Sequence, residues 1–177
     1  MPDPPDALVV APLAVAAVLA IAAVGKLRHP EQGPVSFVGL RVPLPLRRAW
    51  LVRAHPWAEL GLAAGSVLAP TPLRWGFVSA AAALLLGYLA LIARLVWRRE
   101  RVSCACFGIG EHPVTGWTLG RNVALVLAGA LAVIDLANPA SPVARVLQHG
   151  GDGFLWLAIA VGIGVAAVAM DTVARPD

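Results

Sequence analysis

The chain alternates between long apolar stretches and short polar clusters that contain proline or several basic residues. Five apolar stretches, at residues 7–24, 50–69, 73–97, 117–136 and 154–173, are close to the roughly 20 residues that a helix needs to cross the hydrocarbon core of a bilayer. The pattern predicts an all-α fold, a polytopic transmembrane helical bundle with about five spans. We expect a four-helix core, one further C-terminal helix and a single integral membrane domain over residues 1–177.

Composition and the positions of the tryptophans agree with this division of the chain. Hydrophobic residues make up 59% of the sequence and charged residues 14%, which is outside the usual range of soluble domains. Tryptophan concentrates at membrane interfaces, and all six tryptophans lie at or near an end of a predicted span, namely Trp50, Trp57, Trp75, Trp97, Trp117 and Trp156. Residues 36–45 are too short and too rich in proline to cross the bilayer, so we expect them at the interface or the bundle edge.

The net charge of +4 comes from short basic clusters between the apolar stretches. Such clusters favour anionic lipid head groups as the partner and argue against nucleic acid. With five spans, twelve basic residues share one side of the membrane and leave Arg74 and Arg145 opposite. The twelve are Lys26, Arg28, Arg41, Arg47, Arg48, Arg53, Arg94, Arg98, Arg99, Arg101, Arg121 and Arg175. The positive-inside rule makes their side cytoplasmic, which predicts a multi-pass membrane protein with its N-terminus outside and its C-terminus inside.

The only two cysteines of the chain, Cys104 and Cys106, lie in the predicted loop before the fourth span, with one residue between them. A thiolate is both a redox nucleophile and a ligand for soft metals, and the nearby Arg99 and Arg101 favour the thiolate form. A disulfide between the two cysteines would close a very small ring, and this predicts a bond that is easily reduced. An easily reduced disulfide suits a redox couple that oxidises the thiols of another molecule. The alternative is that both cysteines are small apolar residues in a tight turn.

Several ionisable residues are predicted at the membrane level of the cysteine loop. They are Lys26 at the end of the first span, Arg53, His55 and Glu59 near the start of the second, and Arg94 near the end of the third. His55 and Glu59 are four residues apart and therefore share a helix face. Ionisable groups within a span are costly, so we expect Glu59 to face a partner or a wet cavity. Either Glu59 moves a proton with His55 and pairs with Arg53 or Arg94, or it forms a structural ion pair that fixes the bundle.

Two further groups lie close to the cysteines in sequence. Arg121 and Asn122 are about one turn into the fourth predicted span, where we expect them to support the structure by binding loop carbonyls, with a lipid head group as the alternative. His112 follows Cys106 by six residues. It would complete a copper(I) or zinc site with both thiolates, as an alternative to the redox couple.

Four short motifs resemble those of one known family. Gly25-Lys26-Leu27 ends the first span, Pro56 and Glu59 lie in the second, Cys104-Ala105-Cys106-Phe107-Gly108 precedes the fourth, and Arg121-Asn122 opens it. With these motifs the chain resembles the MauE family of methylamine-utilisation membrane proteins, which is related to the DoxX-like group. The resemblance covers most of residues 24–136, and the Cys-x-Cys-Phe-Gly element is its most specific part. Ala105 stands where family members often carry glycine.

This resemblance implies a helical membrane protein that helps to mature the disulfide-rich small subunit of methylamine dehydrogenase, together with a thioredoxin-like partner protein. The helical arrangement is also similar to the vitamin K epoxide reductase bundle, which suggests a quinone as electron partner by architectural analogy alone. Maturation of an exported protein takes place outside the membrane, whereas the charge count places the cysteines inside. Either the thiols work on the cytoplasmic side, or the arginines belong to the site and mislead the count.

The sequence therefore predicts a thiol-disulfide redox function through Cys104 and Cys106, assisted by Glu59 and His55. It leaves open whether the chain is itself a thiol-disulfide oxidoreductase or the membrane partner of one. The alternatives are a carrier of a soft metal or a small lipophile, and a scaffold subunit without catalysis.

Overall fold

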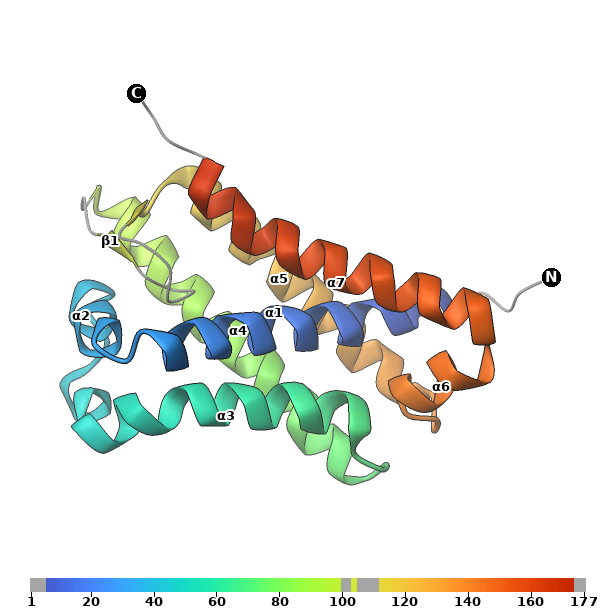
Figure 1. The fold of residues 1–177 in the computed structure, drawn as a ribbon. Helices are drawn as coiled ribbons and strands as arrows, with labels where there is room; N and C mark the ends of the chain where they lie inside the picture. The colour runs from blue at the N-terminus through green and yellow to red at the C-terminus, as the bar shows by residue number, and fades with distance from the viewer. Residues whose placement is uncertain (1–5, 100–102, 105–111, 174–177) are drawn as a thin grey trace.

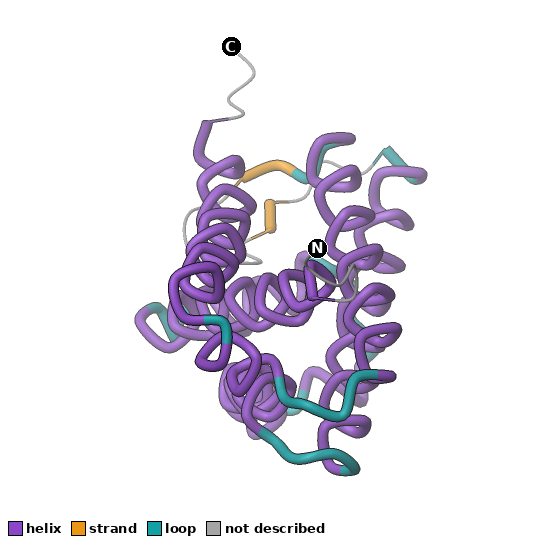
Figure 2. Tube along the Cα trace, turned by 90° about the vertical axis from the view of Figure 1, so that its right-hand side faces the viewer, coloured by secondary structure: helices purple, strands orange, loops and turns teal. Residues whose placement is uncertain are grey.

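The computed structural model describes residues 6–99, 103–104 and 112–173. Its helices are α1 (Val10–Arg28), α2 (Gln32–Gly39), α3 (Ala49–Leu68), α4 (Leu73–Trp97), α5 (Gly116–Ile134), α6 (Pro142–Gln148) and α7 (Gly150–Val173). Two short strands, β1 (Ser103–Cys104) and β2 (His112–Pro113), form an antiparallel pair, and 3-10 turns occupy Asp6–Val9, Leu44–Arg47 and Asp135–Ala137. Helices make up nearly all of the described chain (Figure 2), which confirms the predicted all-α fold.

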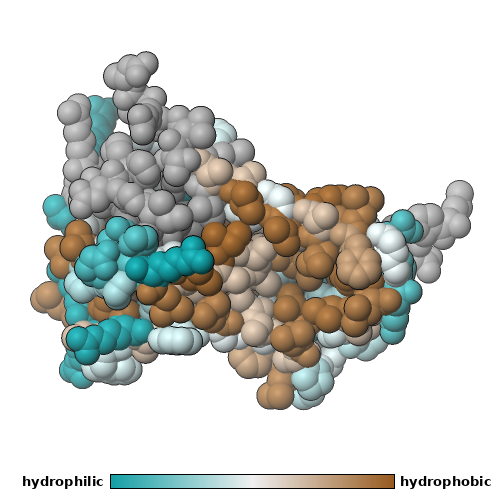
Figure 3. Space-filling model, in the orientation of Figure 1, coloured by the Kyte–Doolittle hydropathy of each residue, from teal (hydrophilic) through white to brown (hydrophobic). Residues whose placement is uncertain are grey.

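The long helices correspond to the five predicted apolar stretches. Among the described residues, four helices are long and apolar enough to cross a membrane: α1, α4, α5 with the turn after it, and the first 18 residues of α7. The fifth, α3, has 20 residues, carries the charged and polar groups Arg53, His55 and Glu59, and packs against α1 and α4. In the space-filling view, apolar side chains cover the middle of the visible face and hydrophilic ones gather mainly at the end that carries α2 (Figure 3).

Helix α1 is the central element of the bundle (Figure 1). It packs against α3, α5 and α7, while α4 packs against α3 and α5. The result is the predicted four-helix core of α1, α3, α4 and α5, with α7 added on α1. Small residues allow this close packing, since a Cβ atom at Gly164 of α7 would lie 3.1 Å from the Cβ of Ala17.

The loops and short elements gather at the two ends of the bundle (Figure 1). The α2 end contains the C-termini of α1 and α4, the N-termini of α3 and α5, and the strand pair. Residues 36–45, expected at the interface or the bundle edge, fall in α2 and the segment after it. Leu40 and Val42 of this segment are buried against Ile92 and Leu95 of α4, so tertiary contacts hold it in place.

The α6 end is closed by three buried charged residues, Arg74, Asp135 and Arg145, which we call the Asp135 cluster. Arg145 donates a hydrogen bond to the carboxylate of Asp135. Arg74 donates to the carbonyl oxygens of Ala140 and Asn138. The exposed fractions of the three residues are only 1–4%. The Asp135 cluster therefore ties the start of α4 to the segment that joins α5 and α6.

Candidate functional site

Four polar side chains from three helices meet inside the bundle near the α2 end. The Oε1 atom of Glu59 accepts hydrogen bonds from Lys26 Nζ and from Tyr88 Oη, each at 2.5 Å. His55 Nε2 lies 2.5 Å from Tyr88 Oη and 3.4 Å from Glu59 Oε1. The Glu59 side chain is completely buried, while Lys26 and His55 are 14% and 19% exposed. We call these four residues the Glu59 cluster.

The helix periodicity explains how these residues come together. Lys26 is in the last turn of α1, and His55 and Glu59 are one turn apart on the same face of α3. Tyr88 lies on the inward stripe of α4, three residues after the buried Leu85 and four before the buried Ile92. Sequence reasoning identified Lys26, His55 and Glu59 but missed Tyr88. Two features of the sequence could have identified Tyr88: it is the only tyrosine of the chain, and it lies within a predicted span.

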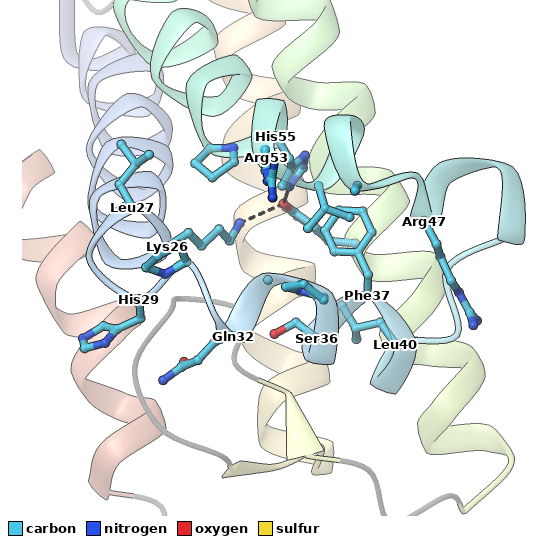
Figure 4. Close-up of a pocket in the computed structure, with 17 residues that line it drawn as sticks. Lys26, Leu27, His29, Gln32, Ser36, Phe37, Leu40, Arg47, Arg53 and His55 are labelled. Atoms are coloured by element: carbon cyan, nitrogen blue, oxygen red, sulfur yellow. Dashed lines mark hydrogen bonds between the residues drawn. The ribbon is translucent and has the colours of Figure 1, made fainter.

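A cavity of about 400 Å³ opens beside the Glu59 cluster (Figure 4). It lies between the end of α1, the helix α2 and the start of α3, and it is also lined by Tyr88. Its walls are largely apolar and include Leu27, Phe37, Leu40, Val52 and Pro56. Lys26, His55 and Tyr88 line the same cavity, and the ring of Phe37 meets the ring of His55 edge-on at 5.4 Å. The cavity thus combines a largely apolar surface with several hydrogen-bonding groups, among them three members of the Glu59 cluster.

A second, much smaller cavity of about 20 Å³ adjoins Glu59. Glu59 and Tyr88 line it together with Arg121 and Asn122 of α5. Glu59 Oε2 is buried and has no hydrogen-bond partner among the described residues. A volume of this size holds about one water molecule, and a carboxylate oxygen is a strong acceptor. Glu59 therefore has all its described contacts on Oε1 and spare acceptor capacity on Oε2.

The strand that carries Cys104 packs beside the wall of the larger cavity. Cys104 in β1 pairs with His112 in β2 in an antiparallel register, and β1 contacts α2. Cys106 lies outside the described residues. Within the described part of the chain, no group of three or more His, Cys, Asp or Glu residues is arranged to hold a metal ion.

The region that contains these features matches a known family. The family model described as "Methylamine utilisation protein MauE" matches residues 5–135, which include α1 to α5 and the strand pair. The chain belongs to the MauE family. Because four of its helices are also long and apolar enough to cross a membrane, it is a MauE-like integral membrane protein.

Two curated MauE proteins show how far the similarity extends. The "Methylamine utilization protein MauE" of Methylorubrum extorquens is 34% identical over 148 residues, which cover 80% of this chain and 77% of that protein. The protein of the same name from Paracoccus denitrificans is 35% identical over 150 residues, which cover 82% of this chain and 77% of that protein. No solved structure matches the chain.

Two of the other predicted site residues in this MauE-family chain, Arg53 and Arg94, do not contact Glu59. Arg53 is exposed on the wall of the larger cavity, and Arg94 is exposed in a shallow depression beside Trp97. The expected pairing of Glu59 with Arg53 or Arg94 is not found among the described residues, where the ion-pair partners of Glu59 are Lys26 and His55.

Arg121 and Asn122 of the MauE-like bundle are both buried. Arg121 Nη1 donates to the carbonyl oxygen of Ala167 in α7 at 3.2 Å. Asn122 Nδ2 donates to the carbonyl oxygen of Thr118 at 2.8 Å. Both contacts are to helix carbonyls, so these side chains join α5 to α7 and stabilise the first turns of α5.

Proposed function

We propose that this MauE-family protein is a membrane thiol-disulfide redox protein that serves methylamine utilisation, with Cys104 and Cys106 as the redox couple. One observation carries the proposal: the strand with Cys104 packs against α2, which walls the cavity lined by Lys26, His55 and Tyr88. A thiol couple served by an acid-base cluster would have what proton-coupled thiol oxidation requires. The names of the two relatives support the assignment to methylamine utilisation.

The reaction is an exchange between this couple and the thiols of a client protein. A disulfide between Cys104 and Cys106 accepts two electrons and two protons from a client dithiol, which becomes a disulfide while the couple becomes two thiols. A thioredoxin-like protein is the proposed redox partner. Glu59 and His55 move the accompanying protons, and Lys26 keeps the buried Glu59 carboxylate compensated in charge.

We assign the α2 end to the cytoplasmic side of a bacterial plasma membrane. Exposed arginines at this end include Arg28, Arg48, Arg53 and Arg98. At the α6 end, Arg74 and Arg145 are buried in the Asp135 cluster. The contrast in exposed positive charge supports an orientation with the N-terminus outside and the C-terminus inside. Labelling Cys104 with a membrane-impermeant maleimide from each side tests this orientation.

Thiol trapping tests the redox couple directly. We expect oxidised protein to resist maleimide and protein treated with a reductant to take up two labels per chain. Cys106→Ser is expected to abolish client oxidation and, through Cys104, to accumulate a mixed disulfide with the partner. Ser103→Ala, a small change in the same strand that leaves both thiols, is the matched control. Full activity in Cys106→Ser would overturn the proposal.

A soft-metal site is the second candidate, because the register of the strand pair places Cys104 opposite His112. With Cys106 these residues would supply two thiolates and one imidazole to copper(I) or zinc. Metal analysis of protein purified under reducing conditions separates the candidates. One metal ion per chain that is lost in His112→Ala would favour metal binding, and metal-free protein with two reactive thiols would favour the redox couple.

A further inference from the structure

The chemistry of the larger cavity indicates what kind of molecule it accepts. Its volume of about 400 Å³ falls in the range of small-molecule sites, which are roughly 300–1,000 Å³. The positive charge of Lys26 is balanced by Glu59, which does not line the cavity. Lys26, Arg47 and Arg53 line it and disfavour a cation. The best fit is a molecule with an apolar body and oxygen atoms that accept hydrogen bonds.

Two of the lining residues keep hydrogen-bonding capacity for such a molecule. The ammonium group of Lys26 has three hydrogens, and its described hydrogen bonds are those to Glu59 Oε1 and to Tyr88 Oη at 3.1 Å. Because Tyr88 donates to Glu59, His55 Nε2 is the donor to Tyr88, and in the neutral imidazole this leaves Nδ1 as an acceptor. Lys26 can therefore donate to a carbonyl oxygen, and His55 can accept from a hydroxyl group. One cavity thus offers partners to both the carbonyl and the hydroxyl form of a ring compound.

The surroundings of the cavity favour entry from the bilayer. Val35 and Val38 on α2 are 60% and 58% exposed. Trp50 and Trp57, near the start of α3, are 63% and 64% exposed. Exposed apolar and tryptophan side chains at a helix end are typical of the membrane interface. These side chains place the cavity at the level of the membrane interface, where ligands dissolved in lipid are present.

We propose that the cavity between α1, α2 and α3 binds a membrane quinone, with a ring oxygen at Lys26 and the ring against the apolar wall; in the reduced form the hydroxyl group at this position would donate to His55. The redox role of the ligand rests on the function proposed above. Oxidation of the two thiols of Cys104 and Cys106 to a disulfide releases two electrons and two protons. Reduction of the quinone to a hydroquinone takes up both, so the step is balanced without a further oxidant.

Equilibrium binding of 2-decyl-1,4-benzoquinone to the protein in phosphatidylcholine nanodiscs tests the site. We expect one saturable site per chain above the partition into empty nanodiscs. Ser36→Trp places a large side chain in the cavity wall and is expected to weaken binding by at least about tenfold. Val35→Trp, on the neighbouring exposed position of α2, is the matched control and should bind as the native protein does.

The chemical class of the ligand is tested with analogues and a paired substitution. Decylbenzene has the same chain without the ring oxygens, and decyl phosphate has an anionic head. Equal or tighter binding of either at this site would overturn the quinone assignment. Lys26→Met combined with Glu59→Gln removes the donor without leaving a buried charge unpaired, and should weaken quinone binding about tenfold. Absence of saturable binding, or equal binding in Ser36→Trp and Val35→Trp, would also overturn it.

Two further measurements cover a failure of Ser36→Trp to fold and separate quinone binding from the redox function. If Ser36→Trp does not fold, a photoreactive azidoquinone on the native protein replaces it. Crosslinks to residues 26–40 or 49–56 support the site, and crosslinks confined to other segments contradict it. Quinone binding is also measured in the Cys104→Ser, Cys106→Ser double variant. Binding that persists there, without quinone reduction by the native dithiol, would support the site and contradict the proposed redox function.

Discussion

The two buried ionic clusters lie at opposite ends of the bundle and differ in what surrounds them. In the Asp135 cluster, Arg74 and Arg145 bind backbone carbonyls and one carboxylate, and neither of the two cavities beside Glu59 reaches them. In the Glu59 cluster, the carboxylate adjoins a cavity of about 20 Å³, and the other three residues line one of about 400 Å³. The first arrangement fixes a connection between helices. The second leaves room and hydrogen-bonding capacity for protons and a ligand.

The largest effect is expected at the closed cluster. Asp135→Asn removes the only carboxylate and leaves two buried arginines uncompensated, so the free energy of unfolding should fall by about 3–5 kcal/mol. Unfolding in detergent, followed by circular dichroism, measures this. Quinone affinity per folded molecule should not change, because the Asp135 cluster lies at the other end of the bundle.

A paired substitution serves as the control for this prediction. Asp135→Leu with Arg145→Met removes both charges of the ion pair, and it should recover most of the lost stability. A loss below about 1 kcal/mol in Asp135→Asn would contradict the structural role of the cluster, because a broken buried pair normally costs more.

A smaller loss of stability and a clear loss of activity are expected at the open cluster. Glu59→Gln keeps the shape and an acceptor but removes the charge, while Lys26 can be hydrated through the cavity. The free energy of unfolding should fall by about 1–3 kcal/mol. Client oxidation should slow by at least about 100-fold, as is typical when a general acid-base group is lost.

Tyr88→Phe gives a useful comparison for Glu59→Gln. It removes one hydroxyl group and keeps the Lys26–Glu59 ion pair, so its effect on the rate should be smaller. Stopped-flow measurement of client oxidation separates the two variants. An unchanged rate in Glu59→Gln would show that the open cluster is structural, as the Asp135 cluster is.

The smallest effect is expected at Arg94, which lies near the α2 end but outside both clusters. Arg94→Gln should change the free energy of unfolding by less than about 0.5 kcal/mol, because the side chain is exposed. Client oxidation and quinone binding should also be unchanged, and both assays check this directly. A slowed oxidation would contradict the placement of Arg94 outside the site.

The sequence predicts the long helices well and the short ones poorly. Four of the long helices, α1, α4, α5 and α7, contain runs of apolar residues whose length matches the bilayer, so composition reveals them, and α3 is a less apolar stretch of similar length. Helix α2 has eight residues and α6 has seven, which is too short for a periodic pattern to stand out. The α2 segment is held in place because Leu40 and Val42 pack against α4. Contacts of this kind join residues that are far apart in the chain, so the local sequence does not predict them.

The candidate site shows the same division. Lys26, His55 and Glu59 could be found because an ionisable group in an apolar stretch is costly and needs a partner. Tyr88 carries no charge and gave no such signal, although its place on the inward stripe of α4 could have been derived. Arg94 follows Tyr88 by six residues, a rotation of about 240° at 100° per residue, so the two cannot face the same partner. Hydropathy thus predicts how deep in the membrane a residue lies. Which residue it pairs with depends on the direction in which its side chain leaves the helix.

The helix at the centre of the bundle, α1, precedes in the chain all the long helices that pack against it. Translation begins at the N-terminus, so α1 enters the bilayer before the helices that cover it. Its buried alanines face lipid until α3 and α5 follow, and α7 closes over it last. The Lys26–Glu59 ion pair joins α1 to α3, and both of its partners precede α5 and α7 in the sequence. The ion pair can therefore form between these two helices before α5 and α7 are added to the bundle.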